Sequence, residues 1–202
     1  MIPDKKTIHA LWDTYHLPSK KRMHCEMVAK VALLIAKTIN AVIPDLIRNP
    51  HKTKKIPAFA GMTKGQKINE QLIVAAALLH DIDKNIEKLP GEHHPDAGVR
   101  VLKQEGMNEV AEVIRTHPLH MILNKKNPPK TIEQKILFLS DKMTRYECIG
   151  IEKRFLIWKK EDYDEESQAI LDASYPKVII LRDEILGNAG IKEEDIAKKL
   201  QT

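Results

Sequence analysis

The sequence predicts an all-α fold, a bundle of packed helices. Residues 20–40 place Val28, Val31 and Ile35 at helical spacing, and residues 68–82 repeat the same apolar periodicity. No segment shows the sustained alternation of apolar and polar residues that marks a half-buried strand. A short run that could be a strand, YPKVIIL, continues directly into LRDEIL, which favours a helix.

The remaining helices follow from apolar spacing and from the residues that begin and end helices. His94-Pro95 predicts a helix start, because proline is favoured in the first turn, and Gly106 predicts its end. Apolar spacing predicts further helices over 107–117, from Ile132 to Met143, over 164–186 and over 191–200. We expect residues 1–147 to form one domain and residues 148–202 to form a C-terminal helical extension that packs on it or supports a homodimer.

Composition excludes several classes of protein. The net charge of +5 suggests a nucleic-acid partner, but residues 43–65 alone carry five basic side chains against Asp45. The rest of the chain is therefore near neutral, and we expect no nucleic-acid binding. No apolar run is long enough to span a membrane, and the N-terminal residues lack the apolar core of a signal peptide. Two cysteines do not make a disulfide framework, so we expect a cytoplasmic protein.

One segment interrupts the helical pattern, VIPDLIRNPHKTKKIPAFAGMT at residues 42–63. Its flanking blocks VIPDLIRNP and IPAFAGMT resemble peptides encoded by short palindromic repetitive elements that insert in frame into bacterial genes. This resemblance implies that residues 43–65 are an inserted surface loop, which loop-closure entropy tolerates at low cost. The alternative is a long lid loop near the active site.

Four polar residues on three predicted helices suggest a metal site. His80 and Asp81 end the apolar stretch AAALLHDIDK, His24 lies on the apolar stripe of residues 20–40, and Asp141 lies within ILFLSDKMTR. A carboxylate within an apolar helix is costly unless it is paired or binds a metal. Taken alone, His24 could be a hydrogen-bonded core histidine and Asp141 could pair with Arg145. As a set, the four residues favour a shared ion.

The order His, His-Asp, Asp resembles the HD-domain superfamily of metal-dependent phosphohydrolases over roughly residues 18–147. AAALLHDIDK and FLSDKMTR carry this resemblance, which implies an HD-domain helical bundle. His24 and His80 are 56 positions apart, and removing the 23 residues of 43–65 leaves 33, a spacing that fits the family.

Two more histidines, His94 and His117, lie between the His-Asp pair and Asp141, as in binuclear members of the superfamily. Their contexts resemble the YqeK-like nucleotide hydrolases. That resemblance implies that Asp81 bridges two ions, with His24, His80 and Asp141 on one and His94 and His117 on the other. His94 could instead cap a helix, and His117 could bond a carbonyl. His93 and His120 could replace them as ligands, whereas His9, His16 and His51 are expected at the surface.

Imidazole and carboxylate ligands suit one or two divalent ions of iron, manganese or zinc, and magnesium less well. The resemblance implies a phosphohydrolase that uses metal-activated water on a small phosphorylated substrate, such as a nucleotide. Asp81 and Lys84 are the predicted catalytic residues. Arg22, Lys142 and Arg145 are the predicted substrate contacts, and salt bridges are the alternative for each. Two other functions stay open: a non-catalytic module that binds metal and nucleotide for regulation, and a di-iron oxygenase.

Overall fold

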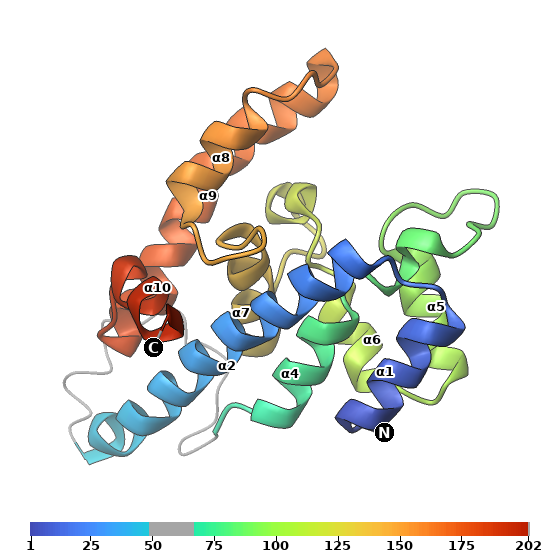
Figure 1. Ribbon diagram of the computed structural model, residues 1–202. Helices are drawn as coiled ribbons and strands as arrows, with labels where there is room; N and C mark the ends of the chain where they lie inside the picture. The colour runs from blue at the N-terminus through green and yellow to red at the C-terminus, as the bar shows by residue number, and fades with distance from the viewer. Residues whose placement is uncertain (49–66, 202) are drawn as a thin grey trace.

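The computed structural model describes residues 1–48 and 67–201, and over these ranges the fold is all-α, as predicted (Figure 1). Within them, no helix combines the length and the apolar character needed to cross a bilayer. The elements are α1 (Lys5–Thr14), α2 (Ser19–Arg48), α4 (Glu70–Leu79), the 3-10 helix η2 (Ile82–Asn85), α5 (Asp96–Gln104), α6 (Asn108–Ile114), the 3-10 helix η3 (Leu119–Leu123), α7 (Ile132–Lys142), α8 (Ile151–Trp158), α9 (Glu165–Ala189) and α10 (Glu193–Gln201).

Helices α2 and α4 form the centre of the bundle, and α7 packs against both. Ala75, Ala76 and Ala77 of α4 are completely buried. Because their side chains are small, the backbones of neighbouring helices can approach α4 closely. On the facing helix, Ile35 and Ile39 of α2 are also completely buried. The N-terminal half of α2 lies beside the C-terminal end of α4, where Sγ of Cys25 is 3.8 Å from Nδ1 of His80.

Two local contacts position the ends of the central helices. Trp12 of α1 is buried, and its indole Nε1 donates to the backbone oxygen of Leu78 at 2.9 Å. At the start of α7, Thr131 and Gln134 form a reciprocal capping box. These contacts fix the C-terminal end of α4 and the first turn of α7.

Several helix boundaries differ from those the sequence predicts. Helix α2 continues through Arg48, so residues 43–48, predicted as the start of an inserted loop, are helical. A formed helix extends at little cost per residue, which accounts for the longer element. The rest of the predicted insertion, 49–65, lies outside the described residues. Helices α1 and α8 were not predicted from the sequence.

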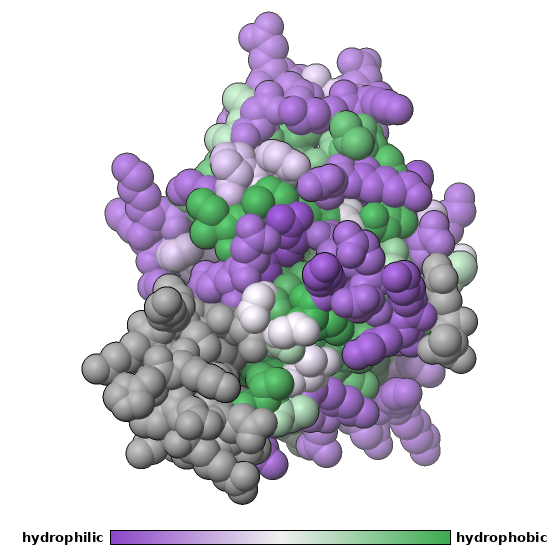
Figure 2. Space-filling model, turned by 90° about the vertical axis from the view of Figure 1, so that its left-hand side faces the viewer, coloured by the Kyte–Doolittle hydropathy of each residue, from purple (hydrophilic) through white to green (hydrophobic). Residues whose placement is uncertain are grey.

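The C-terminal helices pack on the bundle. Helix α9 contacts η3, α2 and α7, and α10 contacts α2. YPKVIIL is part of α9, which confirms the helical interpretation of that run. Helix α8 lies along α9, and together they extend from the body as an arm (Figure 1). The face seen in Figure 2 mixes hydrophilic side chains with smaller apolar areas.

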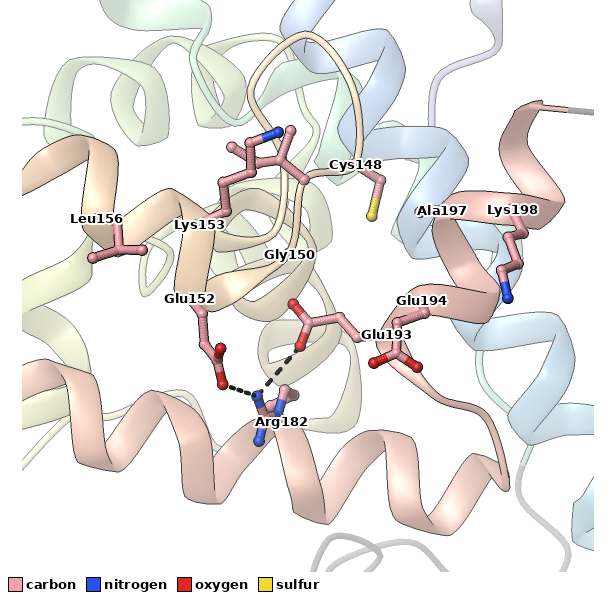
Figure 3. A pocket seen from close by; sticks show the side chains of 11 residues that line it. Cys148, Gly150, Glu152, Lys153, Leu156, Arg182, Glu193, Glu194, Ala197 and Lys198 are labelled. Atoms are coloured by element: carbon pink, nitrogen blue, oxygen red, sulfur yellow. Dashed lines mark hydrogen bonds and ion pairs between the residues drawn. The ribbon is translucent and has the colours of Figure 1, made fainter.

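A pocket of about 590 Å³ lies among α8, α9 and α10 (Figure 3). Arg182 of α9 forms ion pairs across it, at 3.9 Å to Glu152 of α8 and 3.4 Å to Glu193 of α10 (Figure 3). None of the predicted metal ligands lines this pocket. The ion pairs of Arg182 link α9 to α8 and α10, and the pocket lies apart from the predicted site.

The indole bond of Trp12 leads to a stability prediction. Trp12→Phe keeps most of the apolar packing but leaves the buried Leu78 carbonyl without its donor, which costs about 1–3 kcal/mol of unfolding free energy. Urea unfolding followed by circular dichroism measures this loss. Trp158→Phe, on the projecting α8, is the control and should change stability less. Equal stability of the two variants would contradict the anchoring role.

Candidate metal centre

The structure brings all six predicted metal ligands into one cluster from five separate parts of the chain. The ligands come from the first turns of α2, the end of α4, the segments that precede α5 and follow α6, and the last turn of α7. The first of these is His24, followed along the chain by His80, Asp81, His94, His117 and Asp141. All except His94, which is partly exposed, are buried.

One half of the cluster contains His24, His80 and Asp141. The Nε2 atoms of the two histidines lie 3.0 Å and 3.6 Å from Oδ1 of Asp141. These three residues offer ligand atoms close enough together to hold one ion.

The other half contains His94 and His117, and Asp81 lies between the halves. Oδ1 of Asp81 lies 3.5 Å from Nε2 of His94 and 4.0 Å from Nε2 of His117. Oδ2 of Asp81 lies 3.9 Å from Nε2 of His80. Asp81 therefore presents one oxygen to each half, which is the arrangement that a bridging carboxylate needs.

All four clustered histidines are held through Nδ1, and their Nε2 atoms face the cluster. Nδ1 of three of them lies 2.6–2.7 Å from a backbone oxygen, for His24, His80 and His117 that of Arg145, Ala77 and Ile114. Nδ1 of His94 lies 2.8 Å from the Asp83 carboxylate. A carbonyl oxygen only accepts, so Nδ1 of these three rings carries a hydrogen, and the neutral form of each ring keeps its lone pair on Nε2. This is the tautomer in which imidazole binds a metal through Nε2.

Two local features of the structure are consistent with a cation-binding site. Nε2 of His80 is buried and has no hydrogen-bond partner. Nε2 of His94 and Nε2 of His117 lie only 2.8 Å apart. If both rings are neutral with the hydrogen on Nδ1, their Nε2 lone pairs face each other and repel. A divalent ion would accept these lone pairs, so the residues fit a metal.

The charges of the cluster also favour a bound cation. Burial alone would raise the pKa of Asp81, but His80, Lys84 and Lys21 lower it far below its usual value. Asp141 follows the same pattern: Lys142 and its histidine partners outweigh burial and keep its pKa well below the usual value. Both carboxylates are therefore ionised.

The pKa of His117 is shifted in the direction that metal binding requires, whereas that of His80 is not. Burial would lower the pKa of His80, but Cys25, Asp81 and Asp141 raise it well above its usual value, so a metal ion would have to displace its proton. Burial, followed by the neighbouring His94 and His80, lowers the pKa of His117 well below its usual value. The ring is therefore neutral near pH 7 and keeps its lone pair. A neutral imidazole beside ionised carboxylates is a suitable ligand set for a transition ion.

Residues 22–146 match the family model of the HD domain. The chain belongs to the HD-domain family. The matched region contains every residue of the cluster, from His24 to Asp141, and its helical bundle is the fold that the resemblance implied. Comparison with curated proteins and comparison with solved structures each gave no match.

The predicted catalytic residue Lys84 and the predicted substrate contacts Lys142 and Arg145 lie in three different surroundings. Lys142 is buried in the HD domain, where it pairs with Asp141 and donates to the backbone oxygen of His117 at 2.9 Å. The guanidinium of Arg145 lies over Tyr146, at 5.8 Å from the ring centroid. Lys84 stays at the cluster, with Nζ 3.3 Å from Oδ1 of Asp81.

Arg22 points away from the cluster, contrary to its interpretation as a substrate contact. Its guanidinium donates to the backbone oxygens of Leu17 and Trp12 and pairs with Asp13 at 2.6 Å. All these partners lie in α1 or in the turn between α1 and α2, so Arg22 closes that turn. The sequence did not indicate this role, because the partners of Arg22 depend on how α1 packs against the start of α2.

Two of the three histidines expected at the surface are exposed in the structure. His9 and His16 are exposed, and His51 lies outside the described residues. His93 and His120 are exposed as well, and neither belongs to the candidate metal groups of the described residues. His94 and His117 are therefore the histidines that join the cluster.

Two residues of the site were missed in the sequence. Nζ of Lys21 lies 2.9 Å from Oδ2 of Asp81, and buried Asp83 contacts His94. Asp83 is visible in HDIDK as a second acid two positions after Asp81, but its partner is eleven residues further along the chain. Lys21 lies in a basic run, SKKR, from which no single residue stands out.

The contacts of Arg22 lead to a prediction that separates structure from catalysis. Arg22→Gln removes bonds to two backbone oxygens, so the free energy of unfolding should fall by about 1–2 kcal/mol. Metal content and the KM for a substrate should stay at the wild-type values. The exposed Lys20→Gln is the control and should change neither property. A raised KM with unchanged stability would restore Arg22 as a substrate contact.

Proposed function

We propose that this HD domain is a metal-dependent phosphohydrolase that acts on a small phosphorylated substrate, with nucleotides as the favoured class. The observation that carries the proposal is the set of four imidazoles, each held through Nδ1, whose Nε2 atoms converge on two buried carboxylates. A structural bundle gains nothing from such a cluster, because buried charges and lone pairs are costly without a cation.

The ligands divide into two groups that share Asp81. His24, His80 and Asp141 would hold one ion, and His94 and His117 would hold the other. Two divalent ions held there would supply a water of lowered pKa and would neutralise charge on the phosphoryl oxygens. The imidazole-rich set favours iron, manganese or zinc over magnesium, which prefers oxygen ligands.

Cationic side chains are placed to bind the substrate anion. Nζ of Lys84 and Nζ of Lys21 contact different oxygens of Asp81, and both side chains are partly exposed. They come from different elements, η2 and α2, and each contacts one oxygen of Asp81. Phosphate oxygens can replace Asp81 as their partner. Lys142 is buried and orients Asp141 and His117 instead of the substrate.

The shared position of Asp81 gives the first test of the function. Asp81→Ala should lower the occupancy of both ions and abolish hydrolysis, because both halves lose a ligand. Metal analysis and a phosphatase screen over a nucleotide panel measure the two effects. The exposed His120→Ala serves as the control and should keep metal and activity. Full hydrolysis by chelator-treated protein would refute the proposed function.

The second test asks whether two ions bind. His94→Ala and His117→Ala should each reduce the stoichiometry from about two ions to about one, and hydrolysis should fall by orders of magnitude. The first ion should remain, because its three ligands are untouched. His93→Ala is the matched control at a neighbouring exposed position. Wild-type metal content and rate in both variants would make the site mononuclear.

A further inference from the structure

Asp83 is a buried carboxylate that the ligand pattern leaves unassigned. Its side chain is 1% exposed, and its two oxygens lie 2.8 Å and 3.1 Å from Nδ1 of His94. An ionised carboxylate in such a position is costly unless it has a partner. The imidazole of His94 is the partner that the structure provides.

We propose that Asp83 is a positioning residue that orients His94 for the second ion, an inference that rests on the proposed function. His94 differs from the other three clustered histidines. Their Nδ1 atoms are held by backbone oxygens, whereas His94 lies between η2 and α5 and is held by a carboxylate. Its ring is also more exposed, so the ring needs an anchor to keep Nε2 toward Asp81 and His117. A charged acceptor makes a stronger bond than a neutral carbonyl does.

The packing of α5 brings these two residues together. Gly98 of α5 faces η2: a Cβ atom at this position would lie 3.2 Å from Cγ2 of Ile82 and 3.5 Å from Cβ of Asp83. The missing side chain thus lets α5 lie close against η2. His94 precedes α5 and Asp83 lies in η2, so this close approach sets the distance between the imidazole and the carboxylate.

The geometry also distinguishes an orienting role from direct metal binding. Oxygens of Asp81 and Asp83 and a ring nitrogen of His94 lie near enough together for a shared ion. However, both oxygens of Asp83 face Nδ1, whereas Nε2 faces Asp81 and His117. An ion bound through Nε2 therefore lies on the opposite side of the ring from Asp83. This is the arrangement in which a carboxylate holds a metal-binding histidine from behind.

The test titrates Co²⁺ into the full-length wild type, Asp83→Asn, Asp83→Ala and His94→Ala, after removal of bound metal. Asp83→Ala should raise the dissociation constant of the weaker ion about 10–100-fold and leave the tighter ion unchanged. Asp83→Asn should raise it less, because the amide oxygen still accepts from Nδ1. At saturation both variants should show the wild-type Co²⁺ absorption spectrum, since the ligands are the same. Exposed Glu87→Gln is the control and should bind as the wild type does.

Three outcomes would overturn the inference. An unchanged weaker constant in Asp83→Asn and Asp83→Ala would show that the contact has no role in metal binding. If Asp83→Asn lost the second ion as completely as His94→Ala does and showed an altered spectrum, that result would make Asp83 a ligand. A wild type that binds only one ion would leave nothing for His94 to be oriented toward. Hydrolysis is assayed separately: the expected binding pattern without activity would refute the proposed function alone.

Discussion

The structure depends on placing charged groups inside an apolar bundle. Asp81 and Asp141 are buried, and each would be costly without neighbouring positive charge. Lys21 and Lys84 supply that charge to Asp81, and Lys142 supplies it to Asp141. The convergent Nε2 lone pairs add a requirement that these ammonium groups do not meet, because no lysine contacts them in the described residues. A divalent cation would satisfy the carboxylates and the lone pairs together.

Helix ends account for how two of the histidines are held. His80 follows the last residue of α4, and its Nδ1 meets the oxygen of Ala77. His117 lies three residues after Ile114, the last residue of α6, and its Nδ1 meets the Ile114 oxygen. The last carbonyls of a helix lack the usual N–H donor four residues further on, so an imidazole can donate to them. At Ile114 the ring donates beside the backbone N–H of His117 itself. The same bond orients the ring, so each helix end directs Nε2 of its histidine toward the cluster.

Sequence reasoning predicted the six residues that cluster but not the residues that hold them. His24, Asp141 and the His-Asp pair were recognisable because polar groups at apolar helical positions or at a helix end are costly without a partner. His94 and His117 came from the family resemblance. The partners of Arg22 and Asp83 depend on how α1 and α5 pack, and local periodicity carries no such information. Helix boundaries were shifted for a similar reason: His94-Pro95 precedes α5, which begins at Asp96, instead of opening it.

The buried position of Lys142 shows how the two halves of the cluster are coupled. Lysine at the surface of a helix end would be free to meet a substrate, which is how the sequence pattern was interpreted. In the structure its ammonium group joins the carboxylate of Asp141, in one half, to the backbone oxygen of His117, in the other. The segment after α6 is thereby tied to the last turn of α7. Because these two elements carry one residue from each half, a displacement of either would change the distance between the halves of the cluster. The lysine thus sets that spacing.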